Sequence, residues 1–217
     1  MAIGEESVSE VLDLLDWKRR VFALYAEVRL ASDPEAAWAR WREVRAGLFR
    51  DHPQSARPGF EGLDYFDYDP AWRLLAEVVP VEPESRKIGG SGPEPVPARR
   101  FAVARFDGFE LELFWLEEYG AGLFLPFRDA TSGTATYGAG RYLLDTVKGA
   151  DLGSQDGRLV LDFNFAYNPS CAYDPKWACP LAPPANRLAV AVEAGEKEPE
   201  VGLEPTHSRL QGERSTS

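Results

Sequence analysis

Three polar segments in the second half of this chain carry the side chains best suited to binding or chemistry. The first contains Arg128, Asp129 and Arg141, with Tyr137 and Tyr142 close by in sequence. A guanidinium fork held beside tyrosines suits a carboxylate or a phosphate ligand. The alternative is a buried Arg–Asp pair that only fixes a loop, because buried ion pairs are also common structural devices.

The second segment is a run of alternating polar and aromatic residues. Asp162 and Asn164 alternate with Phe163 and Phe165 along an expected strand. Side chains at alternate positions of a strand point to the same face. If that face lines the interior of a barrel wide enough for one small ligand, both residues are pocket groups. If it meets solvent, they are ordinary surface residues.

The third segment contains two similar corners, Tyr167-Asn168-Pro169 and Tyr173-Asp174-Pro175. The residue before a proline is biased towards extended or turn geometry, so each corner redirects the chain. Two such corners could shape the rim of a pocket. Equally, the two tyrosines could close the end of a barrel, with their hydroxyls bonded to backbone groups of the irregular chain.

The two cysteines, Cys171 and Cys179, do not have the spacing of the close pairs in zinc fingers or ribbons. A metal site would need His52 and a carboxylate besides the cysteines, which makes it a weak alternative to the expectation of no metal. No cofactor motif stands out, so no cofactor is expected. In a reducing compartment the cysteines should remain thiols, which disfavours a structural disulfide.

Two helices are expected to precede these segments. Ser7 and Glu10 fit a capping box, and apolar residues recur at roughly helical spacing through Leu30. Asp33-Pro34 then reads as an N-cap followed by proline at the first helical position. On this second helix Trp38, Trp41, Val44, Leu48 and Phe49 could lie on one face, and core packing is the preferred interpretation of its tryptophans.

Short strands follow the helices, with a strong hairpin signal at Asp107-Gly108. The expected strands are 72–79, 99–106, 109–116, 122–127, 141–147, 158–165 and 188–194. Strands at this spacing, with no helices between them, indicate an antiparallel sheet closed into a barrel or folded as a sandwich. The fold class is therefore mainly β with two N-terminal helices (α+β), the helices capping the sheet.

The expected organisation is a helical segment over residues 1–50, a β domain over 51–197 and a disordered tail over 198–217. The chain carries 24 Lys and Arg against 35 Asp and Glu, a formal net charge of −11. An acidic surface repels phosphate backbones and anionic lipids, which argues against nucleic-acid and membrane partners. The acidic N-terminus does not resemble a signal peptide, so the expected location is the cytoplasm. Nothing in the sequence fixes the oligomeric state.

A longer set of motifs resembles one known family. They are Leu123 to Asp129, Thr136-Tyr137-Gly138, Gly140-Arg141-Tyr142, Asp162-Phe163-Asn164, Ala166 to Pro169, Cys171-Ala172-Tyr173, Cys179-Pro180-Leu181 and Asn186-Arg187-Leu188. His52 to Ser55 and Gly62 to Phe66 also match, so the resemblance covers roughly Trp38 to Lys197. The chain resembles the bacterial and archaeal family known as domain of unknown function 1684. That resemblance implies no particular activity, substrate or cofactor.

Three functions are consistent with these patterns. The leading hypothesis is a small-molecule pocket in a β-barrel-like domain, with Arg128 and Arg141 favouring an anionic ligand and with Tyr137, Asn164, Tyr167 and Asn168 shaping it. One alternative is a cofactor-independent enzyme that uses Asp129 or Asp162 as a general base. The other is a structural or protein-interaction domain without a ligand site.

Overall fold

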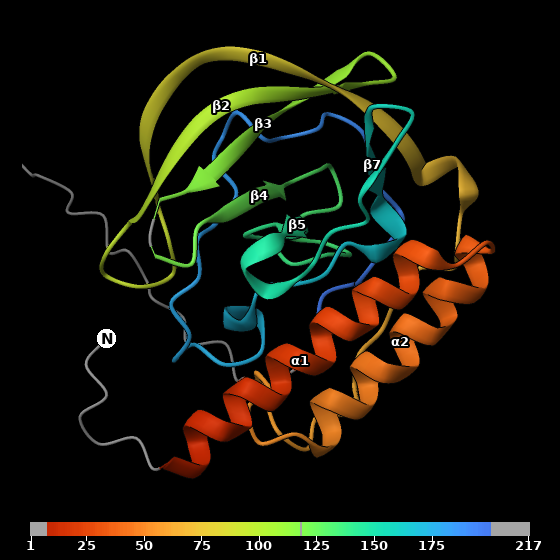
Figure 1. Cartoon of the computed structure of the whole chain (residues 1–217), viewed down its shortest axis with the longest axis vertical. Coiled ribbons are helices and arrows are strands. Elements are labelled where there is room, and N and C mark those ends of the chain that lie inside the picture. The colour runs from red at the N-terminus through yellow and green to blue at the C-terminus, as the bar shows by residue number, and fades with distance from the viewer. Residues whose placement is uncertain (1–7, 118, 201–217) are drawn as a thin grey trace, which may run out of the picture.

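Two helices and a curled antiparallel sheet make up the fold (Figure 1). A computed structural model describes residues 8–117 and 119–200. The sheet curls into a half-barrel, and the helices α1 and α2 lie side by side below it. The fold class expected from the sequence, mainly β with two N-terminal helices, is confirmed. The expected C-terminal tail is outside the described residues from 201 onwards, and so is the capping residue Ser7.

The helices begin and end close to the expected positions. Helix α1 spans Val8–Leu30, and α2 spans Pro34–Asp51. Asp33 caps α2 as expected, because its carboxylate accepts hydrogen bonds from the backbone N–H groups of Glu35 and Ala36 at 3.0 and 3.1 Å. Trp38, Trp41, Leu48 and Phe49 are buried, which confirms their assignment to the core.

Seven strands form one sheet in the order β5-β4-β3-β2-β1-β7-β6, and every neighbouring pair is antiparallel. The strands are β1 (Arg73–Ile88), β2 (Val96–Phe106), β3 (Phe109–Leu116), β4 (Gly122–Phe127), β5 (Arg141–Asp145), β6 (Ser154–Gln155) and β7 (Arg158–Asp162). Four 3₁₀ turns complete the regular elements: η1 (Pro70–Trp72), η2 (Thr146–Lys148), η3 (Phe163–Phe165) and η4 (Ser170–Ala172).

The turn between β2 and β3 is the hairpin expected at Asp107-Gly108. Both residues have positive φ, 44° and 79°, as a type I′ turn requires. Phe106 and Phe109 pair across it, so the two residues between them form the whole loop. The turn fixes the register that buries Leu111 and Leu113 of β3.

Four strand predictions are wrong in their extent. Strand β2 begins at Val96 and not at residue 99. Strand β1 continues to Ile88 through a bulge between Pro80 and Glu84, where prolines are tolerated although they lack an N–H group. Strand β5 ends at Asp145 because the chain then enters η2, and β7 ends at Asp162 because the chain then enters η3. The expected strand 188–194 is an irregular segment with bends at Ala189 and Val190, and it lies outside the sheet.

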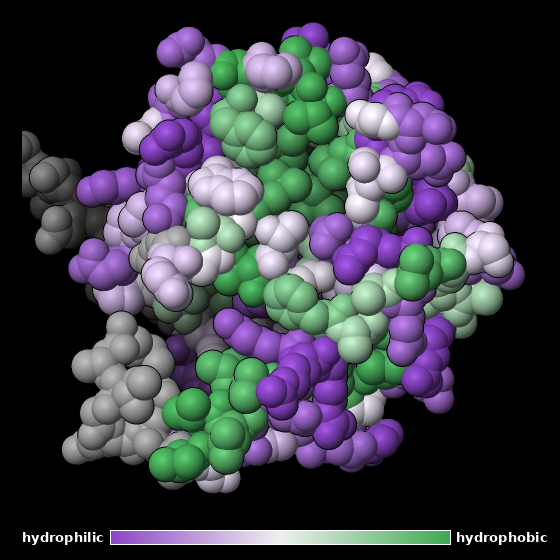
Figure 2. Space-filling view, in the orientation of Figure 1, coloured by the Kyte–Doolittle hydropathy of each residue, from purple (hydrophilic) through white to green (hydrophobic). Residues whose placement is uncertain are grey.

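The outer part of α1 keeps much of its apolar surface exposed. Figure 2 shows apolar side chains gathered at its N-terminal end, where Val8 and Leu12 are 77% and 57% exposed. The helical spacing of these residues is therefore real, but only Leu24 and Tyr25 of α1 are fully buried. In the described part of the chain, no helix is long and apolar enough to cross a membrane.

Candidate functional site

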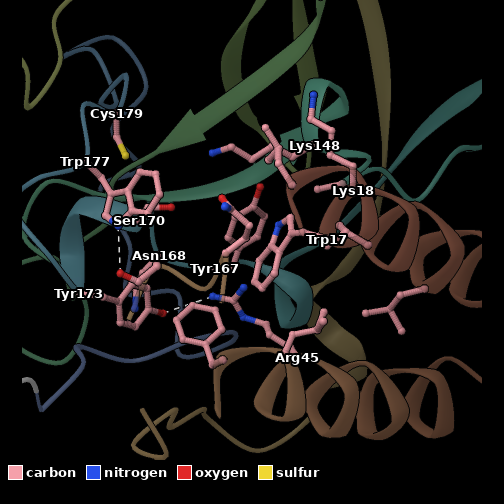
Figure 3. Close-up of a pocket in the computed structure, with 18 of the residues that line it drawn as sticks. Trp17, Lys18, Arg45, Lys148, Tyr167, Asn168, Ser170, Tyr173, Trp177 and Cys179 are labelled. Carbon is pink, nitrogen blue, oxygen red and sulfur yellow. Dashed lines mark hydrogen bonds between the residues drawn. The ribbon is translucent and has the colours of Figure 1, made fainter. Parts of the chain in front are cut away.

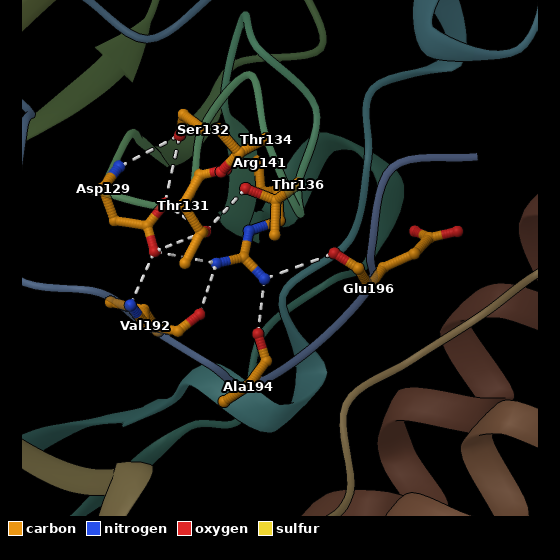
Figure 4. Close-up of polar contacts among 9 residues, drawn as sticks. All are labelled: Asp129, Thr131, Ser132, Thr134, Thr136, Arg141, Val192, Ala194 and Glu196. Atoms are coloured by element: carbon orange, nitrogen blue, oxygen red, sulfur yellow. Dashed lines mark hydrogen bonds and ion pairs between the residues drawn. The ribbon is translucent and has the colours of Figure 1, made fainter. Parts of the chain in front are cut away.

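Arg141 lies at the centre of a buried polar cluster (Figure 4). Its guanidinium donates hydrogen bonds to the carbonyl oxygens of Val192 at 3.0 Å, of Ala194, and of Glu196 at 3.3 Å. These carbonyls belong to alternate residues of a segment that bends at Gly195. Arg141 therefore supplies donors for three backbone carbonyls of residues 192–196.

Asp129 completes this cluster from the other side. Its carboxylate lies 3.4 Å from the Arg141 guanidinium and accepts the backbone N–H of Val192 at 2.7 Å. The hydroxyls of Thr131 and Ser132 also donate to it, at 2.9 and 3.0 Å. Burial lowers the pKa of Arg141 to about 10, so the side chain remains charged at neutral pH.

The Arg141–Asp129 cluster matches the alternative in which a buried ion pair fixes a loop. Both side chains are almost fully buried, at 1% and 0% exposure, and protein groups occupy their hydrogen-bonding positions. The cluster also explains how residues 188–194 are held outside the sheet. Leu188 and Val190 bond the backbone of residues 128–130, and the partners of the Val192 backbone are the side chains of Asp129 and Arg141.

Asp162 and Asn164 also stabilise the backbone, but not as neighbours on one strand face. Because β7 ends at Asp162, the carboxylate caps the following turn by accepting the backbone N–H of Asn164 at 3.1 Å. The Asn164 amide accepts the N–H of Asp69 and donates to its carbonyl, both at 2.9 Å. Burial raises the pKa of Asp162, although hydrogen bonds from Asn164 and the charge of Arg73 oppose this.

The remaining residues of the first segment lie apart from one another. Tyr142 is buried and donates its hydroxyl to the carbonyl of Pro180. The hydroxyl of Tyr137 lies 3.8 Å from the sulfur of Cys171. Arg128 lines a shallow groove together with Arg86 and other residues. The structure therefore does not bring Arg128 and Arg141 to one anion site.

A cavity of about 280 Å³ opens between α1, α2 and the chain around residues 148–150 and 167–179 (Figure 3). Three of the expected site residues, Tyr167, Asn168 and Tyr173, line it. Its walls are mainly apolar and include the rings of Trp17, Tyr25, Trp41, Phe49, Tyr167, Tyr173 and Trp177. Typical ligand pockets measure roughly 300–1,000 Å³, so this cavity suits a small molecule.

Arg45 of α2 is the principal charged group in the cavity wall. Its guanidinium donates hydrogen bonds to the hydroxyls of Tyr65 and Tyr173, at 3.1 and 3.2 Å, and to the carboxylate of Glu196 at 2.8 Å. The Tyr173 hydroxyl in turn donates to Glu196. Burial disfavours the charged form of Arg45, but the Glu196 carboxylate and the neighbouring tyrosines Tyr65, Tyr173 and Tyr25 together outweigh this and raise the pKa of Arg45 well above its usual value.

Two polar atoms of cavity-lining residues have no hydrogen-bond partner in the described part of the chain. They are the Tyr167 hydroxyl and the side-chain carbonyl oxygen of Asn168, and both are buried. The other polar groups of Asn168 are bonded, its backbone N–H to Glu196 and its amide nitrogen to the carbonyl of Lys197. Burial raises the pKa of Tyr167, so its hydroxyl stays protonated and can donate a hydrogen bond.

The three residues of the weak metal alternative do not form one group. His52 accepts the backbone N–H of Gln54 at its Nδ1 atom, and its Nε2 atom lies 3.2 Å from a carboxylate oxygen of Asp16. Across the described ranges, no set of three or more His, Cys, Asp or Glu side chains could hold a metal ion. Cys171 and Cys179 are both free thiols.

Sequence reasoning missed Arg45 and Glu196 as site residues. Arg45 follows Trp41 by four positions and precedes Phe49 by four, so it lies on the same apolar helix face. A charged residue on an otherwise apolar helix face is the signal that could have identified Arg45. Glu196 gave no signal, because it stands at the point where the composition becomes acidic and rich in Gly and Pro.

Comparisons with known proteins agree with the motifs. A family model described as "Protein of unknown function (DUF1684)" matches residues 58–197. The solution NMR structure of an uncharacterised protein from Haloarcula marismortui is 37% identical in sequence and similar in structure, with a TM-score of 0.52. That similarity covers 75% of this chain and 93% of the other. No curated protein matches this chain.

Proposed function

We propose that this chain, which belongs to the DUF1684 family of proteins of unknown function, binds a small anionic molecule with an apolar body in the cavity beside Arg45. The observation that carries the proposal is the pair of unpartnered buried groups, the Tyr167 hydroxyl and the Asn168 carbonyl oxygen. A buried polar group without a partner costs about 1–3 kcal/mol. A ligand that supplies both partners recovers part of that cost.

The charges around the cavity favour an anion. Lys18, Arg45 and Lys148 line it, while no Asp or Glu side chain does so within the described ranges. The carboxylates of Glu196 and Asp145, which do not line the cavity, partly neutralise the charges of Arg45 and Lys148. Lys18 has no comparable pair among the described ion pairs. An anionic group in the cavity would therefore be attracted by cations on more than one wall.

The uncharged groups define the rest of the ligand. The aromatic walls favour a flat or apolar body, since rings pack edge-to-face or stack with offset. The Tyr167 hydroxyl can donate a hydrogen bond to the anion. The Asn168 carbonyl oxygen accepts only, so it calls for a hydroxyl or an N–H on the ligand. A small hydroxy acid with an aromatic or alkyl body meets all three requirements.

The groove that contains Arg128 is the second candidate for an anion site. Arg86, Lys87 and Arg128 line it, but so does the carboxylate of Glu112. Within the described residues, no unpartnered buried oxygen belongs to this groove. The cavity beside Arg45 is therefore the preferred site.

A titration with three matched probes tests the proposal. We expect para-hydroxybenzoate to bind more tightly than benzoate, because its hydroxyl can donate to Asn168. Benzoate should bind roughly tenfold more tightly than neutral benzamide, since tenfold corresponds to about 1.4 kcal/mol and a hydrogen bond to a charged group contributes about 1.5–3 kcal/mol. The fluorescence of Trp17, Trp41 and Trp177, which line the cavity, can report binding.

Charge variants provide the control for this titration. The double variant Lys18→Ala, Lys148→Ala should reduce the difference between benzoate and benzamide, because it removes two cations from the cavity wall. Lys87→Ala removes a lysine from the groove instead and should leave that difference unchanged. Equal affinity for benzoate and benzamide in the unmodified protein would contradict the proposed anion site.

A further inference from the structure

We propose that Cys171 and Cys179 form a redox-active dithiol, which exchanges with low-molecular-weight disulfides and closes into a reversible internal disulfide. This goes beyond ligand binding and does not depend on it. Within the part of the chain that the structure describes, these are the two free cysteines. Cys179 lines the cavity, and Cys171 lies next to it, since the two thiols are joined by a side-chain hydrogen bond.

Cys171 is suited to be the attacking sulfur. It lies within η4 and is partly exposed, so a small disulfide can reach it. The thiol of Cys179 donates a hydrogen bond to it, and the Tyr137 hydroxyl lies 3.8 Å from its sulfur. These hydrogen bonds outweigh the effect of burial and lower the pKa of Cys171 to about 6. A thiol with this pKa is mainly thiolate at neutral pH, and the thiolate is the nucleophile.

Cys179 is suited to be the resolving sulfur. It is only 5% exposed, so external reagents are largely excluded from it. The hydrogen bond to Cys171, together with burial, raises the pKa of Cys179, so it stays protonated while Cys171 is ionised. Its thiol is hydrogen-bonded to Cys171, and from this position it can attack a mixed disulfide.

The backbone around both cysteines holds this arrangement. The N–H of Cys179 donates to the hydroxyl oxygen of Ser91 at 2.9 Å, and the N–H of Ser91 donates to the carbonyl of Cys179 at 3.0 Å. At Gly90 a Cβ atom would lie 2.8 Å from that same carbonyl, so the two chains pack as closely as glycine allows. On the other side, the turn of η4 is closed by the N–H of Tyr173 bonding to Ser170.

The exchange has two steps. The Cys171 thiolate attacks one sulfur of a disulfide RSSR, forming a mixed disulfide and releasing RS⁻. The Cys179 thiol then loses its proton and attacks the Cys171 sulfur, forming the internal disulfide and releasing a second RS⁻. In sum, the two protein thiols are oxidised and one RSSR is reduced to two thiols. An excess of RSH reverses both steps.

Oxidised glutathione is the probe for this proposal. We expect the full chain, after incubation with it and alkylation of the remaining thiols, to carry no alkyl group and no glutathione by intact-mass spectrometry. Addition of dithiothreitol should restore two alkylatable thiols. Two thiols that remain alkylatable in oxidised glutathione, or a stable mixed disulfide in the unmodified protein, would overturn the proposal.

Two variants assign the roles of the sulfurs. Cys179→Ala should trap one glutathione on Cys171, whereas Cys171→Ser should leave Cys179 unmodified because it is buried. In the unmodified protein the rate of iodoacetamide alkylation at Cys171 should rise with a midpoint near pH 6. In Cys179→Ala that midpoint should move up towards about 8.5, the usual thiol pKa. An unchanged midpoint would show that Cys179 does not activate Cys171.

Discussion

Replacement of Arg141 by alanine should lower the free energy of unfolding by about 3–5 kcal/mol, the usual cost of removing one partner from a buried ion pair. The change leaves three carbonyl oxygens of residues 192–196 without their donor. It also leaves the buried carboxylate of Asp129 without its cation. Urea unfolding followed by circular dichroism measures the loss. Arg141→Lys should recover only part of it, because an ammonium group cannot reproduce the planar fork.

Arg105→Ala is the matched control for this variant. Arg105 also pairs with a carboxylate, that of Glu110 at 2.7 Å, but both side chains are about half exposed. Exposed pairs contribute about 0–1 kcal/mol, so the control should be close to the unmodified protein. If Arg141→Ala were as stable as Arg105→Ala, the guanidinium would not hold the C-terminal segment, and a ligand role for Arg141 would regain weight.

Replacement of Glu196 should lower the stability of the protein and raise its affinity for an anionic ligand. Glu196→Ala leaves the largely buried guanidinium of Arg45 without a carboxylate, and it removes the acceptor of the Tyr173 hydroxyl. We expect a loss of about 3–5 kcal/mol in the free energy of unfolding. The milder Glu196→Gln should lose less, because its side-chain oxygen can still accept a hydrogen bond.

The affinity for benzoate should change in the opposite direction. In Glu196→Gln the charge of Arg45 is no longer balanced from behind, so the cavity becomes more attractive to an anion. Benzoate should therefore bind more tightly to Glu196→Gln than to the unmodified protein, while benzamide should show little change. Asp64→Asn is the control, since Asp64 pairs with the neighbouring Lys197 at the surface. Weaker benzoate binding to Glu196→Gln would mean that Arg45 does not attract the ligand.

Arg141 and Glu196 are connected through the backbone between residues 192 and 196, and together they stabilise the wall of the cavity. Arg141 and Asp129 hold the extended chain from Val192 to Glu196. Gly195 lets that chain turn, with φ of 78°, where a Cβ atom would lie 2.6 Å from the carbonyl of Phe163. The turn places Glu196 against Arg45. The motif residues at positions 128–142 therefore affect the cavity indirectly, because they hold the backbone that positions Glu196.

Local signals explain what the sequence could predict. The cap at Asp33 and the hairpin at Asp107-Gly108 each depend on residues close together in the chain, and the structure has both. The strand prediction for 188–194 is wrong because its pattern is strand-like, while its partners are the irregular backbone of residues 128–130 and the side chains of Asp129 and Arg141. Composition and periodicity do not contain such long-range pairings.

The candidate site was predicted only in part, for the same reason. Tyr167, Asn168 and Tyr173 were recognised because their two corners interrupt the strand pattern, and all three line the cavity. Arg141 and Asn164 were equally conspicuous, yet their polar groups bind backbone atoms of the chain itself. A sequence shows that a polar group needs a partner. Which partner it finds is decided by the packing of distant segments.

We propose that an anionic small molecule binds in the cavity beside Arg45. The most direct test is amide chemical-shift mapping during a titration with para-hydroxybenzoate. We expect saturable shifts around the cavity, at Trp17, Lys148, Asn168 and Tyr173. Saturable shifts confined to the groove around Arg86 and Arg128, or no saturable shifts at all, would contradict it.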